Sequence, residues 1–455
     1  MRSSKWFAVL FFTINLLICS FYIDVWQNGN AVSRALPIIT FFESGTFRID
    51  KYHELTPDKA FVNGNYFTDK APLPTLYVLP FFGLASWTGF ISPDEKGNLF
   101  GPEVLIIGGI LAGSVPLALL ITLLYLRIRK YRSGISPVWL STLPFYGSFM
   151  FVFSGTYFGH LFAGALLLIF YLFLQQKRFL LSGIFAGLTF ISEYNLAVLI
   201  FFMGLFLLWK EKKIKPLLVF ALGVLPSILF ILWYNSKFST SPFVFLYKYH
   251  NYNQLDQNYG FRLPGIEAFW GLTFSPYRGM FFYVPVLLTG FYFLFRQLIN
   301  RSIANLLNNI LFIPSVLYFI FIASYFAWWG GWCYGPRLLM GMLILLLFEV
   351  VTKIAKHAIP KYIVWITIII GLVINVSAKA TIVYDAPTGI YNPFIELVAT
   401  KFLAGHLNPN NLLSIVFDVP SQLAFVIFSV TLFGGIWVLD IFRPERNLTA
   451  EIRHK

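Results

Sequence analysis

The sequence predicts an all-α polytopic membrane protein with about twelve transmembrane helices. Of its 455 residues, 58% are hydrophobic and only 12% are charged. Soluble domains carry about 25% charged residues, so this chain has too little polar surface to cover a globule. Apolar runs separated by short basic clusters follow one another along the chain, which is the pattern of helices that cross a lipid bilayer.

The net charge of +14 does not indicate a nucleic-acid partner. The lysines and arginines are confined to short clusters between apolar runs, as the positive-inside rule requires of cytoplasmic loops. The two cysteines, Cys19 and Cys333, show no zinc-site spacing and give no reason to expect a disulfide.

Seven basic clusters fix the expected topology, because each should lie on the cytoplasmic side. An even number of crossings must then separate neighbouring clusters, which places both termini inside. The clusters are Arg2/Lys5, Arg127/Arg129/Lys130/Arg132, Lys177/Arg178, Lys210/Lys212/Lys213/Lys215, Arg296/Arg301, Lys353/Lys356/Lys361 and Arg443/Arg446/Arg453/Lys455.

Twelve apolar segments satisfy this topology. They are residues 6–23, 103–126, 136–153, 156–175, 179–191, 194–209, 216–234, 280–295, 303–326, 335–352, 361–378 and 421–441. The first resembles a signal peptide, but it lacks an evident cleavage site, so we expect an uncleaved helix. The run 73–90 is nearly long enough to span. A span there would put Arg127–Arg132 outside, so we expect a helix in the outer interface.

The chain is therefore expected to form a single membrane domain, residues 1–455, with three large extracytoplasmic segments. These are the first loop, 24–102, a second large loop, 235–279, and a third segment, 379–420. Residues 442–455 form a cytoplasmic tail. Most acidic residues outside the apolar runs fall in the three outer segments, so chemistry that needs carboxylates is expected on that side.

The first loop is too polar to be only a connector. After an apolar run that ends near Gly45, it contains two turn signals, Thr56-Pro57-Asp58 and Asn63-Gly64. The sequence Asp69-Lys70-Ala71-Pro72 follows. This loop places carboxylates and cations close together.

The order of motifs in this loop resembles the membrane glycosyltransferases of the GT-C superfamily. The matching features are, in order, an Arg, Glu-x-Gly, Asp-x-Ala, Asn-Gly, Tyr-Phe and acid-Lys-x-Pro. The nearest resemblance is to the bacterial group that includes protein O-mannosyltransferases and aminoarabinose transferases. Later segments fit the same group: Gly159-His160, Gly187 to Tyr194, Leu272 to Phe281, and Trp328-Trp329-Gly330-Gly331-Trp332-x-Tyr334-Gly335-Pro336-Arg337.

The resemblance implies a GT-C-type bundle with large first and fourth extracytoplasmic loops, in the bacterial inner membrane. It also implies transfer of a sugar from a polyprenyl-phosphate donor, with inversion, to a glycan, lipid or protein acceptor outside the cytoplasm. Such chemistry needs cations for the leaving phosphate and a carboxylate to take a proton from the acceptor hydroxyl. The superfamily allows a divalent metal, but the sequence shows no clear ligand set, and we expect no other cofactor.

One departure leaves the base open. Relatives usually carry an Asp just after the first span, a few residues before the Arg. Here that position falls near Asn30, whose amide cannot act as a base, and Asp24 lies too far upstream to match it. The candidate bases are Asp69, which precedes Lys70 in the acid-Lys-x-Pro motif, then Asp58, then Glu43. Each also has a structural alternative. Asp69 could form a surface ion pair, Asp58 could close a turn, and Glu43 could pair with a loop arginine.

Six residues are candidates for substrate binding: Arg34, Lys70, His160, Glu193, Arg278 and Arg337. Lys70 would contact the donor phosphate. Arg34 would bind phosphate or pair with an acid of the loop. The two later arginines would bind phosphate or extend to the lipid headgroups. Glu193 interrupts an apolar stretch, where an ionisable residue is costly and marks a functional candidate. The Trp328–Trp332 cluster would form an interfacial belt or a platform that stacks on sugars.

Two other functions remain open from sequence. A transporter or flippase would carry charges midway along several helices and two related halves. Here mid-helix acids are few, mainly Glu193 and Glu349, and no internal repeat is visible. An inactive subunit that keeps the fold is the other alternative, and the absence of an Asp at position 30 favours it.

Overall fold

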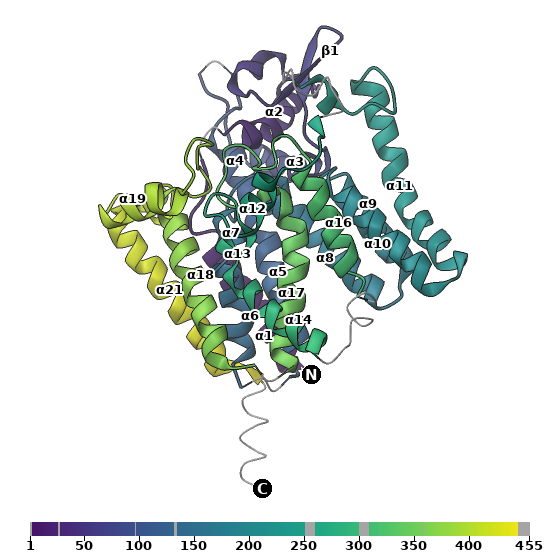
Figure 1. The fold of residues 1–455 in the computed structure, drawn as a ribbon. Coiled ribbons are helices and arrows are strands. Elements are labelled where there is room, and N and C mark those ends of the chain that lie inside the picture. Colours follow the sequence, from purple (N-terminus) through teal and green to yellow (C-terminus); the bar gives the residue numbers. More distant parts are fainter. Residues whose placement is uncertain are drawn as a thin grey trace.

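The computed structural model describes residues 2–25, 28–95, 97–131, 134–250, 260–299, 309–357 and 359–444. Across these residues the fold is a bundle of apolar helices covered at one end by a smaller layer (Figure 1). Helix α1 (Arg2–Cys19) begins at the opposite end of the bundle, and helix α21 (Ser421–Phe442) ends there. The chain is thus the helical membrane protein that its composition predicts.

Five helical segments of the described residues are long and apolar enough to cross a membrane. They are Pro102–Ile128 (α4, Pro102–Gly109; η2, Ile110–Ser114; α5, Val115–Ile128), α11 (Ile214–Phe238), Arg337–Lys356 (η7, Arg337–Leu339; α17, Met340–Lys356), α18 (Lys361–Thr381) and α21. The segments containing α5 and α17 are buried inside the bundle. α11 and α21 lie at its edge and expose leucine and valine side chains, as lipid-facing helices do.

Shorter helices complete the bundle. They are α6 (Pro137–Tyr146), α7 (Phe149–Val152), α8 (Gly159–Gln175), α9 (Phe179–Phe190), α10 (Leu196–Glu211), α12 (Ile266–Thr273), α13 (Met280–Tyr283), η6 (Pro285–Leu288), α14 (Thr289–Ile299) and α16 (Phe312–Ala323). The short pair α9 and α10 is the one expected at 179–209. α9 packs on α11 where Gly183 and Gly223 meet, because a Cβ on Gly183 would lie 3.0 Å from the Gly223 Cα.

The segment expected to span at 136–153 is broken between α6 and α7. Side chains of α18 bind the Gly147 carbonyl at this break and the carbonyls at the end of α7. Asn375 Nδ2 donates to the carbonyl oxygens of Gly147, Gly371 and Tyr283 at 2.9–3.2 Å. Lys379 Nζ donates to the carbonyls of Val152 and Ser154. Irregular backbone at membrane depth is tolerated only where protein groups satisfy it in this way.

The layer over the bundle, here called the cap, comprises residues 28–91. It contains α2 (Gly29–Ser44), η1 (Asp50–Leu55), the antiparallel strands β1 (Lys59–Val62) and β2 (Asn65–Thr68), and α3 (Leu73–Trp87). The Asn28 side chain caps α2, and Gly45 ends it in a left-handed conformation. Ile38, Ile39, Val78 and Phe82 join α2 and α3 to the bundle.

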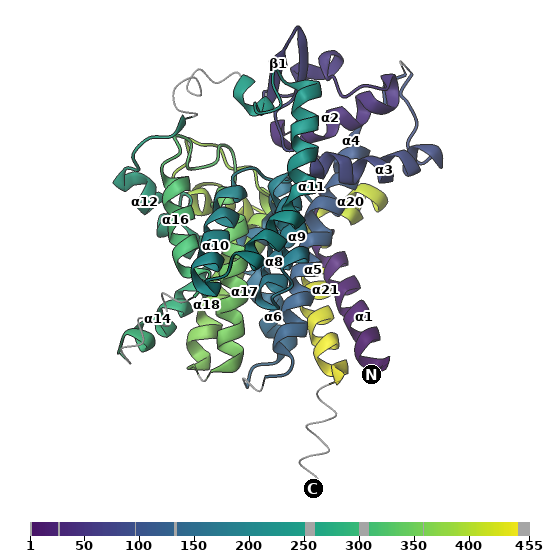
Figure 2. The same cartoon turned by 90° about the vertical axis from the view of Figure 1, so that its right-hand side faces the viewer.

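The helix α3 is the run 73–90 that was expected at the interface. Its fifteen residues are fewer than the ~20 that a span requires. In Figure 2 it lies across the bundle beneath α2 rather than along the spanning helices. Leu84, Trp87 and Phe90 are exposed at its far end, which agrees with contact to lipid.

Short elements of the later loops close the same end of the bundle. They are η3 (Leu246–Tyr249), η8 (Phe394–Ala399), α19 (Thr400–Leu403) and α20 (Leu412–Phe417).

Candidate active site

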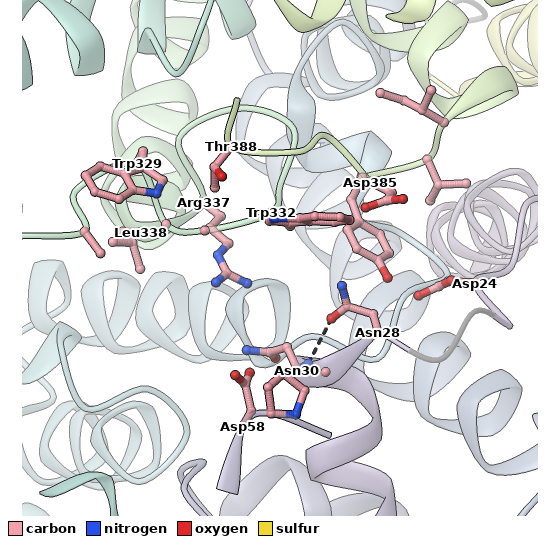
Figure 3. A pocket seen from close by; sticks show the side chains of 18 of the residues that line it. Asp24, Asn28, Asn30, Asp58, Trp329, Trp332, Arg337, Leu338, Asp385 and Thr388 are labelled. Carbon is pink, nitrogen blue, oxygen red and sulfur yellow. Dashed lines mark hydrogen bonds between the residues drawn. The ribbon is translucent and has the colours of Figure 1, made fainter. Parts of the chain in front are cut away.

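A cavity of about 1070 Å³ lies between the cap and the adjoining end of the bundle. Five stretches far apart in sequence contribute to its wall: the start of α2, the cap turn at Asp58 and Lys70, the loop at His250, the loop 325–338, and residues 381–409. Figure 3 shows Arg337 pointing into this space between Trp332 above and Asn30 and Asp58 below. Residues from each of the large loops therefore line the cavity.

Four charged or ionisable side chains form one wall, here called the cap wall: Asp58, Asp69, Lys70 and His250. Lys70 Nζ lies 2.8 Å from Asp58 Oδ2 and 3.1 Å from Asp69 Oδ1. His250 Nε2 lies 3.3 Å from Asp69 Oδ2 and 3.6 Å from Asp58 Oδ1. One lysine and one histidine thus bridge two carboxylates.

The hairpin explains why the two carboxylates meet. β1 and β2 pair in a register that sets Lys59 opposite Thr68, around the Asn63-Gly64 turn. Asp58 directly precedes β1 and Asp69 directly follows β2, so the turn predicted from sequence brings the two residues side by side. His250 reaches them from the second large loop through a β-bridge with Ala60.

The side chains of the cap wall differ in how far they are exposed. The Asp69 side chain is 0% exposed, whereas Asp58 and Lys70 are 17% and 13% exposed and line the cavity. Asp69 also accepts a 3.5 Å hydrogen bond from Ser33. Asp69 therefore lies behind Lys70, and Asp58 faces the space where a substrate would bind.

Asp58 and Lys70 hold one another in their ionised forms. Burial alone would raise the pKa of Asp58, but Lys70 and His250 together lower that pKa well below its usual value. Burial would lower the pKa of Lys70, but Asp58 and Asp69 raise it above its usual value. At neutral pH the cap wall carries a carboxylate and an ammonium at the cavity surface.

Arg337 gives the cavity a second cation. It follows the Gly330-Gly331 turn, and its guanidinium carbon lies 5.5 Å from the centre of the Phe158 ring. Its Nε is buried without a hydrogen-bond partner, and within the described ranges Arg337 has no ion pair with a carboxylate. A cation that points into a cavity without an acidic partner is suited to bind an anionic ligand.

Arg34, His160 and Glu193 form a separate cluster that does not line the cavity. Arg34 Nη2 lies 2.8 Å from Glu193 Oε1, and His160 Nδ1 lies 3.4 Å from the same oxygen. Gly159 allows this approach, because a Cβ there would lie 2.5 Å from Glu193 Oε1. The cluster joins α2 of the cap to the start of α8 and the junction of α9 with α10.

Two further candidates have other partners. Arg278 is fully buried and donates to the carbonyl oxygens of Tyr277, Trp329 and Gly331 at 2.8–3.2 Å. It thereby fixes the loop that carries Arg337. Glu43 contacts Lys51 and Tyr52 and accepts from the backbone N–H of Leu99, all within 2.8 Å. Burial would raise the pKa of Glu43, but these three contacts lower it.

In the wall opposite the cap, only Trp332 was singled out from sequence, as part of the Trp328–Trp332 cluster. This wall contains Asp24, Trp332, Tyr384, Asp385 and Lys401. Asp24 accepts a hydrogen bond from the Tyr384 side chain, and burial raises the pKa of Asp385 while Lys401 lowers it. The available signal was that Asp24 is the first acid after the first span. Nothing in the sequence pairs residue 24 with residue 384.

The cavity residues do not form a preassembled metal site. Within the part of the chain that the structure describes, no three His, Cys, Asp or Glu side chains are grouped so that they could hold a metal ion.

Comparison with known proteins gives one likeness. No family model and no curated protein matches this chain. Among solved structures it is similar to ArnT from Cupriavidus metallidurans bound to undecaprenyl phosphate, with a TM-score of 0.45 and 13% sequence identity. The match covers 97% of this chain and 76% of that chain.

Proposed function

We propose that this protein is a membrane glycosyltransferase that moves a sugar from a polyprenyl-phosphate donor to an acceptor on the extracytoplasmic side. The observation that carries the proposal is the pair of cations, Lys70 and Arg337, facing one cavity that also contains the carboxylate of Asp58. The first-loop resemblance supports the same chemistry. A lipid-linked donor needs a polar cavity at the end of an apolar bundle, and the cap and bundle together supply one.

The proposed roles follow from what each group faces. Arg337 binds the donor phosphate, because it points into the cavity and lacks an acidic partner in the described chain. Lys70 stabilises the charge that grows on the phosphate as it leaves. Asp58 accepts the proton of the acceptor hydroxyl. Among Asp69, Asp58 and Glu43, only Asp58 lines the cavity. Asp69 acts behind Lys70, and Glu43 holds the cap together.

The reaction is a single displacement. The acceptor oxygen forms a bond to the anomeric carbon as the bond from that carbon to the phosphate oxygen breaks. The acceptor proton passes to the Asp58 carboxylate, and the polyprenyl phosphate leaves with the bonding electron pair. Attack opposite the leaving group inverts the anomeric configuration. Arg34, Glu193 and His160 support this geometry by fixing α2, and Arg278 supports it by fixing the loop before Arg337.

The test uses purified protein in nanodiscs and a panel of radiolabelled polyprenyl-phosphate sugars, with membrane extract from the source cells as acceptor. We expect turnover of at least one donor, reduced about 10²–10⁴-fold in Asp58→Asn. Glu43→Gln is the matched control, because Glu43 is a carboxylate of the same cap outside the cavity, and its turnover should stay within a few-fold of wild type.

Two results would argue against these roles. Full turnover in Asp58→Asn, with loss in Asp69→Asn at unchanged stability, would move the base to Asp69. No turnover of any donor by folded protein with active extract would overturn the transferase and favour a transporter or an inactive subunit.

A further inference from the structure

The wall opposite the cap has the composition of a sugar site. Of the three tryptophans in the motif, Trp328 is 5% exposed and packs inside the bundle, whereas Trp332 is 56% exposed and lines the cavity. Figure 3 shows the Trp332 ring extended across the upper side of the cavity, between Arg337 and Asp385. A large aromatic ring left uncovered inside a polar cavity offers a flat apolar face to a ligand.

The backbone on both sides of Trp332 is held in place. The turn before it, Gly330-Gly331, has φ of 76° and 73°, and the Gly331 carbonyl accepts from Arg278 at 3.2 Å. The residue after it, Cys333, donates its backbone N–H to the Ala386 carbonyl at 3.1 Å. This second bond ties Trp332 to the segment that carries Asp385. The ring and the carboxylate are therefore presented together.

The other polar groups of this wall are of mixed kind. Asp24 and Asp385 accept hydrogen bonds, Lys401 donates them, and the Asn28 amide does both. All four line the same cavity as Trp332. With Arg337 assigned to the donor phosphate, the remaining groups are one ammonium and two carboxylates, which favour neither a cationic nor an anionic ligand. A neutral ring bearing hydroxyl groups matches the mixture, because each hydroxyl both donates and accepts.

We infer that Trp332, Asp24, Asp385 and Asn28 form the acceptor subsite, and that the acceptor is a saccharide whose ring stacks on Trp332. The inference rests on the proposed transferase function and adds the class of acceptor. The subsite shares the cavity with Asp58 and Arg337, so a sugar stacked on Trp332 can offer a hydroxyl toward the cap wall. The saccharide can belong to a free glycan or to a glycolipid, which present the same chemistry to this wall.

The first test asks which component of the membrane extract accepts the labelled sugar. Periodate cleaves the vicinal diols of sugars, and proteinase K destroys proteins, so each treatment is applied to the extract and quenched before the assay. We expect acceptor activity to be lost after periodate and kept after proteinase K. Partition of the labelled product between organic and aqueous phases then separates a glycolipid from a free glycan. Activity that survives periodate, or that is lost after proteinase K, would overturn a saccharide acceptor.

The second test measures kinetics against each substrate. Trp332→Ala should raise the KM for acceptor about tenfold while the KM for donor changes less than about twofold. Trp332→Phe keeps a flat ring and should recover most of the acceptor affinity. Asp385→Asn should raise the acceptor KM in the same direction. Equal effects on donor and acceptor, or the same loss in Trp332→Phe as in Trp332→Ala, would overturn the subsite.

The two proposals fail in different ways. If no donor is turned over under any condition, the transferase itself fails. If donor is turned over but the acceptor is not periodate-sensitive, or the Trp332 variants act on the donor, the transferase stands and the acceptor subsite fails.

Discussion

The ion pair between Arg34 and Glu193 gives the sharpest stability prediction, because it fastens the cap to the bundle. The two side chains are 2% and 14% exposed, and their closest atoms lie 2.8 Å apart. Glu193→Gln removes the charge while keeping the shape, and it leaves the buried guanidinium unpaired. Breaking a buried pair in this way costs about 3–5 kcal/mol.

The surroundings place the expected cost at the lower end of that range. Arg34 keeps weaker acceptors in the Asn30 side chain at 3.3 Å and the Ala71 carbonyl at 3.5 Å. At about 2.1 cal/mol/K per residue, the entropy of unfolding for this chain is roughly 1 kcal/mol/K. A loss of about 3 kcal/mol therefore corresponds to a Tm lower by about 3 °C.

The assay is thermal unfolding of the detergent-solubilised protein as a double-mutant cycle with Arg34→Met and Glu193→Gln. We expect each single variant to be destabilised and the double variant to recover part of the loss, with a coupling of about 1–3 kcal/mol. Glu267→Gln, at an exposed acid on α12, is the control and should leave Tm unchanged. Additive effects, or a tenfold higher donor KM in Arg34→Met at unchanged Tm, would refute a structural role and favour phosphate binding by Arg34.

Three further predictions concern the cap and the loop before Arg337. Because Lys70 and His250 hold the pKa of Asp58 below its unfolded value of about 3.9, its stabilisation is present above that pH and lost as the pH falls through the lower folded pKa. The Tm difference between wild type and Lys70→Met should therefore shrink from pH 7 to pH 3, and a constant difference would contradict the charge network. Arg278→Met should lower Tm by several degrees, because it leaves the carbonyls of Tyr277, Trp329 and Gly331 without their donor; an unchanged Tm would show that this loop is held by other contacts. Glu43→Gln should leave kcat within about twofold but speed limited trypsin cleavage after Arg48 or Lys51, since Glu43 ties this segment to Tyr52 and Leu99; unchanged cleavage would contradict that role.

The sequence was sufficient for the helical membrane fold because hydropathy acts locally. The long apolar runs that become α11, α17, α18 and α21 could be read directly. The break between α6 and α7 could not, since the Gly147 carbonyl at the break is bound by Asn375, 228 residues later in the chain. An apolar run shows that a segment belongs in the membrane, but it does not show where distant side chains interrupt its helix.

The candidate site was likewise predictable only where its signals are local in the sequence. The Asn63-Gly64 turn and the acid-Lys motif were visible, and the hairpin register brings Asp58 and Asp69 together on that basis. Which of the two faces the cavity is decided by burial against α2 and the loop at His250, and neither contact has a local signal. Asp24 and Tyr384 lie 360 residues apart, so the opposite wall is visible only in three dimensions.

The central claim is that the phosphate of a polyprenyl-linked donor binds between Lys70 and Arg337 in the cavity beneath the cap. The most direct measurement is an experimental structure of the protein in nanodiscs with added polyprenyl phosphate. We expect phosphate density within hydrogen-bonding distance of both cations, with the Asp58 carboxylate facing the space beside it, and we expect Arg337→Met to abolish that density. A structure in which the phosphate binds elsewhere, or in which the cavity stays free of it at saturating lipid, would contradict the account.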